Sequence, residues 1–399
     1  MSIEFLIISL IKSGLVAFVL LTALAYIQWL ERKVLAHIQL RVGPRRVGPH
    51  GLLQPLADVV KLITKEDMIP SHVNKVFYLL APFMAVTFAL ISIAVIPFGE
   101  NFTAFGYKTT MGLTDINIGV LFILAISSMG VYGVALAGWS SNNKYALLGG
   151  LRSSAQMISY ELPMALAIAS PLLILNTLNL RKIVEGQAGF YFDFLPRWSI
   201  FQGPWPQIFA FILFLIAGFA ETNRVPFDLP EAENELVAGF HTEYGSMKFA
   251  AFFMAEYCNI ITVCCMGVLL FLGGWQPLWN PALGANFVPV LIFAFAGGIS
   301  IFHGLNPARK LDRYTLPAAG VIFLGLAAIF LIPGLRDVLL PLFWFLAKVL
   351  LVLFVFIWIR GTLPRFRYDQ LMKFAWTFMF PVALINLLIT GFLVALTTK

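Results

Sequence analysis

Charged side chains are scarce in this 399-residue sequence, at 12% of all residues. A soluble domain carries about 25% charged residues. Hydrophobic residues make up 60% of the chain, and the mean hydropathy is +0.86. This composition leaves too few polar side chains to cover a water-exposed surface. It therefore excludes a water-soluble globular protein and indicates a protein that lies in a membrane.

Cysteine and histidine are also rare. The three cysteines, Cys258, Cys264 and Cys265, fall in one predicted helix without a C-x-x-C motif, so neither a zinc site nor an iron–sulfur cluster is predicted. No pair of histidines lies mid-helix at a spacing that would bind haem, and no glycine-rich dinucleotide loop joins a strand to a helix. We therefore expect no metal and no cofactor bound by this chain. If it works in a redox system, the cofactors belong to partner chains.

Long hydrophobic runs make up most of the sequence. A helix needs about 20 apolar residues to cross roughly 30 Å of hydrocarbon, and only helices and closed barrels satisfy their backbone there. Ten runs approach or exceed that length, at 4–30, 76–98, 116–138, 155–178, 205–221, 249–273, 286–303, 316–334, 341–360 and 374–395. The first run is too long for a signal peptide, so we expect it to remain as a helix. We predict an all-α, polytopic integral membrane helix bundle of about ten transmembrane helices.

Positive charges lie mostly on one side of the predicted membrane. If the N-terminus is outside, the inside segments hold 19 of the 27 lysines and arginines. Lysine and arginine accumulate in short cytoplasmic loops, so we expect both termini to lie outside. The predicted organisation is a membrane core at 1–275 with cytoplasmic loops at 31–75, 139–155 and 221–249, an additional transmembrane hairpin at 276–340, and the last two core helices at 341–399.

The first inside segment combines arginines with tight turns. The tetrapeptide Arg-Val-Gly-Pro occurs at 41–44 and again at 46–49, and its Gly-Pro turns would hold the guanidinium groups in defined places. Residues 51–65 place their leucines, valines and isoleucine on one stripe, which predicts an amphipathic helix at the membrane interface. A basic loop resting on anionic lipid headgroups is the alternative interpretation.

Acidic residues gather where the charge pattern would not place them. The third inside segment holds six acids and, up to its last acid, a single base, Arg224. Glu161 and Glu256 lie within predicted membrane helices, Glu161 about seven residues from the cytoplasmic end, and such groups usually mark a proton or substrate path. Helix capping by Asp228 accounts for part of the acidic loop, and structural pairing is the alternative for the helical acids. Lys348, in a later helix, is expected to pair with an acid.

Four blocks of this sequence resemble one known family, and they occur in the same order. They read ERKVLAHIQLRVGPRRVGPHGLLQPLADVVKL at 31–62, GGLRSSAQMISYELPMAL at 149–166, AETNRVPFDLPEAENELVAGFHTEY at 220–244 and RGTLPRFRYDQLM at 360–372. Over 1–275 and 341–399 the chain is similar to the H subunit of bacterial NADH:quinone oxidoreductase, which is homologous to mitochondrial NADH dehydrogenase subunit 1. The resemblance implies a multi-pass protein of the bacterial inner membrane. Such a protein forms much of a quinone tunnel and couples quinone reduction to proton pumping.

The resemblance also implies site residues and partners. The acidic proton path would comprise Glu31, Asp58, Glu161, Glu221, Glu231, Glu233, Glu235 and Glu256. The basic loop beside the tunnel mouth would comprise Arg32, Arg41, Arg45 and Arg46. Quinone would be the substrate, while FMN and the iron–sulfur clusters would belong to partner subunits. The expected partners are the hydrophilic quinone-site and terminal-cluster subunits, small membrane subunits and membrane lipids, with no nucleic acid, and the chain would not be active alone.

One region departs from the family pattern. Members of the family usually have eight helices, and residues 276–340 hold two further apolar runs without an acidic residue. We expect this hairpin to pack outside the core and to take no part in the quinone or proton path. Two other functions stay open: the equivalent subunit of an energy-converting hydrogenase or of a ferredoxin- or deazaflavin-linked complex, and a free-standing proton-coupled transporter.

Overall fold

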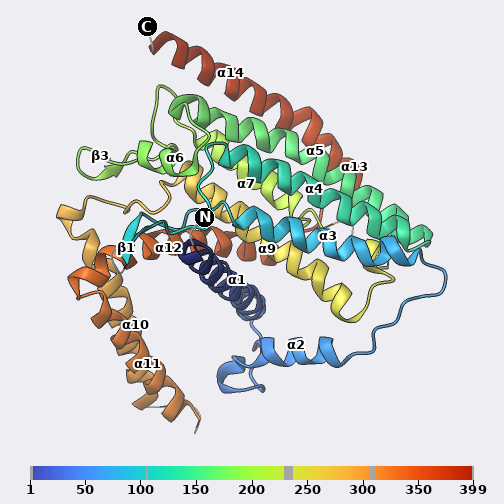
Figure 1. Cartoon of the computed structure of the whole chain (residues 1–399), viewed down its shortest axis with the longest axis horizontal. Coiled ribbons are helices and arrows are strands. Elements are labelled where there is room, and N and C mark those ends of the chain that lie inside the picture. Colours follow the sequence, from blue (N-terminus) through green and yellow to red (C-terminus); the bar gives the residue numbers. More distant parts are fainter. Residues whose placement is uncertain (1–2, 105–106, 229–236, 306, 308–310, 398–399) are drawn as a thin grey trace.

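The computed structural model describes residues 3–104, 107–228, 237–305, 307 and 311–397. Within these ranges nine helices are long and apolar enough to cross a membrane (Figure 1), so the prediction of a polytopic helical membrane protein is confirmed. They are α1 (Ile3–Ile38), α3 (Lys75–Ile93), α4 (Gly119–Ser140), α5 (Lys144–Leu175), α9 (Ser246–Phe271), α10 (Val288–Leu305), α11 (Asp312–Ile329), α12 (Pro333–Thr362) and a continuous helical run of α13 (Tyr368–Phe374), the π-turn η5 (Ala375–Met379) and α14 (Phe380–Thr397).

The fifth predicted run forms only the short helix α7 (Ile208–Glu221), which has 14 residues and a length of about 21 Å. This is too short to cross the hydrocarbon. The backbone beyond α7 is satisfied by the protein, because Gln156 Nε2 donates to the carbonyl oxygens of Ala220 and Phe227, both at 2.8 Å. Irregular backbone is tolerated at membrane depth only where protein buries it. Helix α7 therefore ends inside the bundle, with Glu221 as its last residue.

Helix α5 is longer than predicted. It begins at Lys144, eleven residues before the expected start, and the Asn143 side chain caps it by accepting from the backbone N–H of Tyr145 at 3.0 Å. Glu161 consequently lies 17 residues after the first residue of the helix, and not about seven as the hydrophobic run suggests. The polar first turns of α5 concealed its start, because apolar length alone was used to place it.

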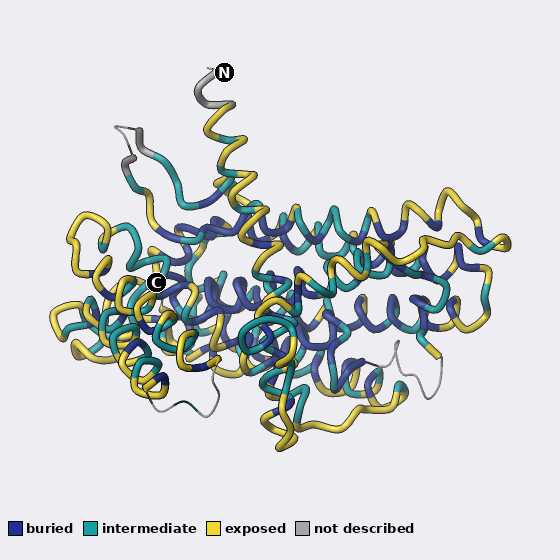
Figure 2. The backbone as a smooth tube through the Cα atoms, turned by 90° about the horizontal axis from the view of Figure 1, so that it is seen from below, coloured by how far each residue is buried: buried dark blue, intermediate teal, exposed yellow. Residues whose placement is uncertain are grey.

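The centre of the bundle is α9, which is the most buried of the nine helices and lies against α3, α7 and α12. Helices α4 and α5 meet through glycines. A Cβ atom at Gly150 would lie 3.1 Å from the Cα of Gly138, and small residues of this kind let membrane helices approach closely. Figure 2 shows the buried residues concentrated in these central helices, while most of the described first half of α1 is exposed.

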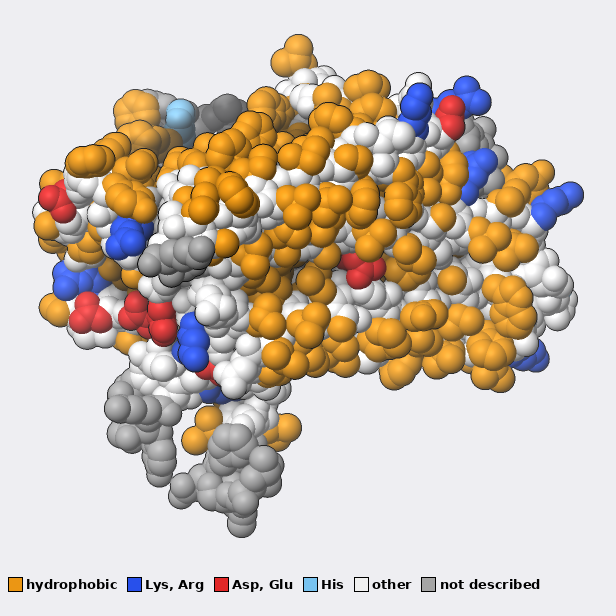
Figure 3. Space-filling model, turned by 90° about the horizontal axis from the view of Figure 1, so that it is seen from above, with side chains coloured by type: hydrophobic (Ala, Val, Ile, Leu, Met, Phe, Trp, Pro, Cys, Tyr) orange, Lys and Arg blue, Asp and Glu red, His pale blue; other side chains and the backbone are white. Residues whose placement is uncertain are grey.

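Short elements connect the long helices. They are α2 (Gln54–Thr64), α6 (Leu180–Gly186), the 3₁₀ turns η1 (Pro49–Gly51), η2 (Gly239–His241), η3 (Pro281–Leu283) and η4 (Ala285–Phe287), and the strands β1 (Phe102–Ala104), β2 (Tyr107–Thr109), β3 (Phe190–Tyr191) and β4 (Leu195–Pro196). Strands β1 and β2 form one antiparallel pair, and β3 and β4 form another. The outer surface between these connections is broadly hydrophobic, as expected for lipid contact (Figure 3).

The predicted amphipathic helix is present as α2, below α1 in Figure 1. Its Leu56, Val60 and Ile63 are exposed, which is the apolar stripe that the sequence predicts. Ser246, the first residue of α9, anchors the end of α2 by donating its Oγ proton to the carbonyl oxygen of Leu62 at 2.9 Å. An anchored helix with an exposed apolar stripe suits the membrane interface or a neighbouring subunit.

The additional hairpin consists of α10 and α11, which lie side by side at one edge of the molecule (Figure 1). A Cβ atom at Gly297 would lie 3.0 Å from the carbonyl oxygen of Gly320, so the two backbones are in close contact. Phe293 of α10 packs its ring edge against Phe343 of α12, with 5.9 Å between the ring centroids. The hairpin therefore meets the core mainly through an aromatic contact with α12.

Lys348 lacks the acidic partner that the sequence suggested. Its ammonium group is buried on α12 and donates to the carbonyl oxygens of Leu272, Gly274 and Gln276 at 2.7, 2.8 and 2.7 Å. These carbonyls follow the last turn of α9, where the helix leaves unpaired acceptors and a partial negative charge. The lysine therefore stabilises a helix end. The expected ion pair with an acid was wrong.

The predicted inside segments are hydrogen-bonded to one another. Asn143 donates to Glu243 at 2.8 Å, and Arg365 contacts Asp228 at 3.3 Å. Together with the bond from Ser246 to α2, these contacts join four loops that are far apart in the sequence. The loops therefore lie on one face of the bundle.

A labelling experiment tests the predicted sidedness of that face. Lys65→Cys, on the inside face, should react with a membrane-impermeant maleimide only in inverted vesicles, whereas Phe192→Cys, on the opposite face, should react only in right-side-out vesicles. Positions 65 and 192 are exposed, and the three native cysteines are buried and so contribute little background. Reaction of position 65 from the outside would reverse the topology.

Candidate functional site

A buried cluster of charges joins α1, α9 and α12 to the segment that follows α7. Arg224 Nη2 donates to Glu31 Oε2 at 2.6 Å and to Tyr257 Oη at 2.7 Å, and its Nη1 is paired with Glu256. Tyr257 Oη donates in turn to Glu31 Oε2 at 2.7 Å. Arg360 also pairs with Glu31. Four segments of the chain thus converge on two carboxylates and two guanidinium groups.

This cluster holds its charge in an environment with little water. The side chains of Arg224, Glu31 and Glu256 are only 7%, 4% and 13% exposed. Charges buried to this extent are tolerated when they are paired and hydrogen-bonded. The guanidinium of Arg224 also lies over the Tyr257 ring, 4.6 Å from its centroid. The geometry keeps both acids ionised and mutually linked through one arginine.

A second pair of acids lies deeper in the bundle. Glu221 ends α7 and is buried, and its charge interacts with that of Glu161 on α5. Glu161 accepts a hydrogen bond from Ser128 of α4. Two carboxylates this close repel each other when both are ionised, so one proton shared between them is favourable.

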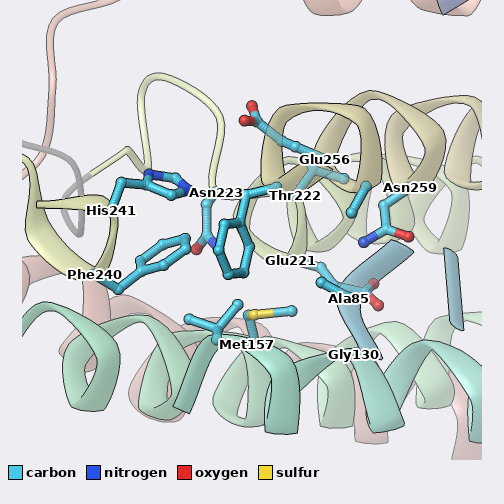
Figure 4. A pocket seen from close by; sticks show the side chains of 13 residues that line it. Ala85, Gly130, Met157, Glu221, Thr222, Asn223, Phe240, His241, Glu256 and Asn259 are labelled. Carbon is cyan, nitrogen blue, oxygen red and sulfur yellow. The ribbon is translucent and has the colours of Figure 1, made fainter. Parts of the chain in front are cut away.

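A cavity of about 50 Å³ lies between the two groups of acids. It is lined by Glu221 and Glu256, and also by Asn259 and His241 (Figure 4). The Glu256 carboxylate points away from the Glu221 side chain (Figure 4), in keeping with its pairing to Arg224. At roughly 10–15 Å³ for each water molecule, the cavity has room for about three to five. Its polar lining could hold a short chain of water between the acids.

The segment 237–245 closes this cavity on the inside face. A Cβ atom at Gly149 would lie 2.6 Å from the Cα of Gly239, so η2 sits directly on the backbone of α5. Tyr244 stacks on Tyr78 with 4.2 Å between ring centroids and shares a hydrogen bond with Ser140. Burial raises the pKa of the Tyr244 phenol above its usual value. Tyr244 therefore stays protonated at neutral pH and acts as a fixed hydrogen-bond donor.

A separate hollow of about 700 Å³ opens beside the end of α1. It is lined by all four arginines that the sequence singled out, Arg32, Arg41, Arg45 and Arg46. Arg32 Nη1 donates to Asp58 Oδ2 of α2 at 2.8 Å. The remaining lining comes mainly from the first Arg-Val-Gly-Pro repeat. The hollow is thus a cationic recess with an apolar floor, in the size range of small-molecule sites.

The structure brings most of the predicted acids together. Glu31 and Glu256 share one cluster, Glu161 and Glu221 form the second pair, and Asp58 binds the arginine hollow. Glu231, Glu233 and Glu235 lie outside the residues that the structure describes. In the described ranges no group of three histidine, cysteine or acidic residues could hold a metal ion.

Sequence reasoning missed residues that complete the site. Arg224 was visible as a single base among acids, but nothing indicated that it would bridge Glu31 and Glu256. Arg360 contributed only to the charge count, and Tyr257 and Asn259 gave no signal because a lone polar residue in a helix is common. Helical spacing could have helped in one case, since Tyr257 adjoins Glu256 on α9 and Asn259 lies three residues further on.

Comparisons with known proteins agree with the resemblance of the four blocks. A family model described as NADH dehydrogenase matches residues 11–391. The chain is 66% identical over 396 residues to the H-type subunit 1 of NADH-quinone oxidoreductase from Solibacter usitatus, and the match covers 99% of both chains. It is 48% identical to the H-type subunit 2 of Koribacter versatilis over 98% of each chain, and 45% identical to the H-type subunit 2 of Geobacter metallireducens over 98% of this chain and 96% of that one.

Those alignments run over nearly the full length of each relative, so they include the additional hairpin at 276–340. The comparison thus agrees with the helical membrane fold and with the four blocks that carry the resemblance. The chain therefore belongs to the family of H subunits of NADH-quinone oxidoreductase, and it is a multi-pass membrane subunit of this bacterial respiratory complex.

Proposed function

We propose that this subunit forms part of the quinone tunnel of the complex, with the arginine hollow at the tunnel mouth. The hollow has a suitable volume, about 700 Å³, and combines cationic side chains with apolar walls. Guanidinium groups can hydrogen-bond the carbonyl oxygens of a quinone headgroup, and they stabilise negative charge that develops during reduction. Quinone is the substrate, and the reducing electrons arrive from FMN and iron–sulfur clusters on partner subunits.

We further propose that the buried acids carry protons away from quinone chemistry. The observation that supports this most strongly is the junction at Glu31 and Arg32. Arg32 lines the hollow and binds Asp58, while the adjacent Glu31 enters the buried cluster with Arg224. A change of charge in the hollow therefore acts directly on the first buried acid.

The path continues from that cluster to the deeper acids. Glu256 pairs with Arg224 and lines the cavity that also contains Glu221, which is coupled to Glu161. Water in the cavity would connect these acids, since each gap is short and polar. By family resemblance, Glu231, Glu233 and Glu235 complete the acidic set. The hydrophilic quinone-site and terminal-cluster subunits would lie against the same inside face, and smaller membrane subunits and lipids would surround the bundle.

Arginine removal tests the tunnel proposal. Arg45→Ala and Arg46→Ala should each raise the KM for quinone about threefold to tenfold, because each removes one charge-assisted contact at the mouth. NADH oxidation with an artificial electron acceptor should stay at the level of the unaltered complex, since these residues carry no electrons. Both activities can be measured in the purified complex.

The matched control is Lys65→Ala, which removes an exposed cation from the same inside segment but does not line the hollow. Its quinone kinetics should be unchanged. Normal quinone kinetics in both arginine variants would contradict the tunnel proposal and favour contact with anionic lipid headgroups.

A further inference from the structure

The inner turn of the additional hairpin reaches the arginine loop. Asp312, the first residue of α11, places its Oδ1 3.2 Å from Nε2 of His50. The Asp312 side chain is only 12% exposed. His50 belongs to η1 and directly follows the second Arg-Val-Gly-Pro repeat. A carboxylate in the first turn of a helix is favoured by the helix dipole, so Asp312 is well suited to remain ionised and to accept from the imidazole.

The arginine loop is folded so that a contact at His50 affects the whole hollow. His50 has φ 52°, a left-handed conformation that side chains other than glycine rarely adopt. The next residue, Gly51, also has a positive φ, and a Cβ atom there would lie 2.4 Å from the carbonyl oxygen of Pro44. The turn that carries His50 thus sits on the first repeat, which provides most of the hollow. Strained conformations of this kind persist only where surrounding contacts hold them.

The hairpin is a firm support for such a contact. A Cβ atom at Gly304 would lie 2.5 Å from Cδ of Pro317, so α10 and α11 are tightly packed near the inner turn. At the other end, Phe293 contacts Phe343 of α12. Helix α12 also carries Arg360, which binds Glu31. The hairpin is therefore attached to the same helix that holds the buried cluster.

We propose that Asp312 is a positioning residue, which holds the arginine loop through His50 and so shapes the quinone-binding hollow. This inference rests on the proposed tunnel function, and it replaces the sequence-based expectation that the hairpin takes no part in the quinone path. Asp312 touches no substrate. It acts by keeping His50, and with it the loop of Arg45 and Arg46, in one conformation.

The test uses the intact complex in proteoliposomes, with decylubiquinone as the probe. Asp312→Ala and His50→Ala should each raise the KM for the probe about threefold to tenfold, while kcat and NADH oxidation with an artificial acceptor stay unchanged. The double variant should be no worse than either single variant, because both remove the same contact. Asp312→Asn keeps a neutral acceptor and should fall between the native protein and Asp312→Ala.

Asp337→Asn is the matched control, since this carboxylate is also near the hairpin but is 74% exposed and pairs only locally with Arg336. Its kinetics should equal those of the native complex. An unchanged KM in Asp312→Ala or His50→Ala, or effects that multiply in the double variant, would overturn the positioning role. If the alanine variants do not assemble, His50→Cys combined with Asp312→Cys carries the test. A short bifunctional maleimide should join the two positions in the intact complex, and failure to join them would refute the contact.

The two proposals fail in distinguishable ways. If Arg45→Ala and Arg46→Ala raise the KM but Asp312→Ala does not, the tunnel proposal stands and the positioning role is wrong. If the arginine variants leave quinone kinetics unchanged, the tunnel proposal is wrong, whatever the maleimide shows about the contact between His50 and Asp312.

Discussion

Replacing Arg224 by glutamine is expected to prevent accumulation of the assembled complex. The substitution leaves Glu256 as a buried carboxylate without its arginine and removes one of the cations that bind Glu31. Breaking a buried pair in this way costs about 3–5 kcal/mol. That is comparable with the whole stability of a typical domain, about 5–15 kcal/mol. The amount of complex in the membrane, measured by blue-native electrophoresis, should therefore fall at least about tenfold.

The cost should be relieved when the cluster is made neutral again. In the double variant Arg224→Gln with Glu256→Gln, the remaining acid Glu31 keeps its pairing with Arg360. Assembly should therefore recover, while proton pumping stays low because one acid of the proposed path is lost. Arg224→Lys should not recover assembly, since a single ammonium cannot bridge two carboxylates as a guanidinium does. Normal assembly of the Arg224→Gln variant would mean that the cluster contributes little to stability.

Replacing Glu161 by glutamine is expected to abolish most proton pumping while the complex stays assembled. Glutamine keeps the size of the side chain and can still accept from Ser128, but it cannot exchange a proton. A positioned group that transfers protons contributes about 10²–10⁴-fold to a rate, so pumping should fall at least about tenfold. Glu221→Gln should behave in the same way, because the two acids act as a coupled pair. NADH-driven acidification of proteoliposomes measures the effect.

The matched control for this substitution is Glu185→Gln, which makes the same chemical change on an exposed acid of α6, away from the cavity. It should pump normally. Quinone reduction in the Glu161→Gln variant should also slow, since pumping and turnover are linked in the proposed mechanism. Full proton translocation in a Glu161→Gln and Glu221→Gln double variant would remove this pair from the mechanism.

Several features of the site were visible in the sequence because they depend on short-range patterns. The doubled Arg-Val-Gly-Pro repeat predicted arginines held by tight turns, and all four singled-out arginines line one hollow. The spacing of Leu56, Val60 and Ile63 predicted the exposed stripe of α2. Each of these inferences needs only a few neighbouring residues. Local chemistry was therefore sufficient for them.

Other features could not be found in this way. Arg224 and Glu31 are separated by 193 positions in the chain, and no periodicity relates them. The early end of α7 depends on Gln156 of another helix, whose side chain satisfies the exposed backbone. The partner of Lys348 was mistaken for the same reason, because backbone carbonyls give no signal in a sequence. The contact between His50 and Asp312 likewise joins the first loop to the additional hairpin.

The sequence by itself determined the class of the protein, the positions of its hydrophobic runs and its family, since these follow from composition, apolar length and blocks of consecutive residues. Only the tertiary structure decided which charges meet. A charge can be buried in a membrane protein only with a partner close by, and the partner is chosen by helix packing, not by position along the chain. The path from the arginine hollow through Glu31 and Arg224 to Glu221 therefore exists only once α1, α7, α9 and α12 have come together.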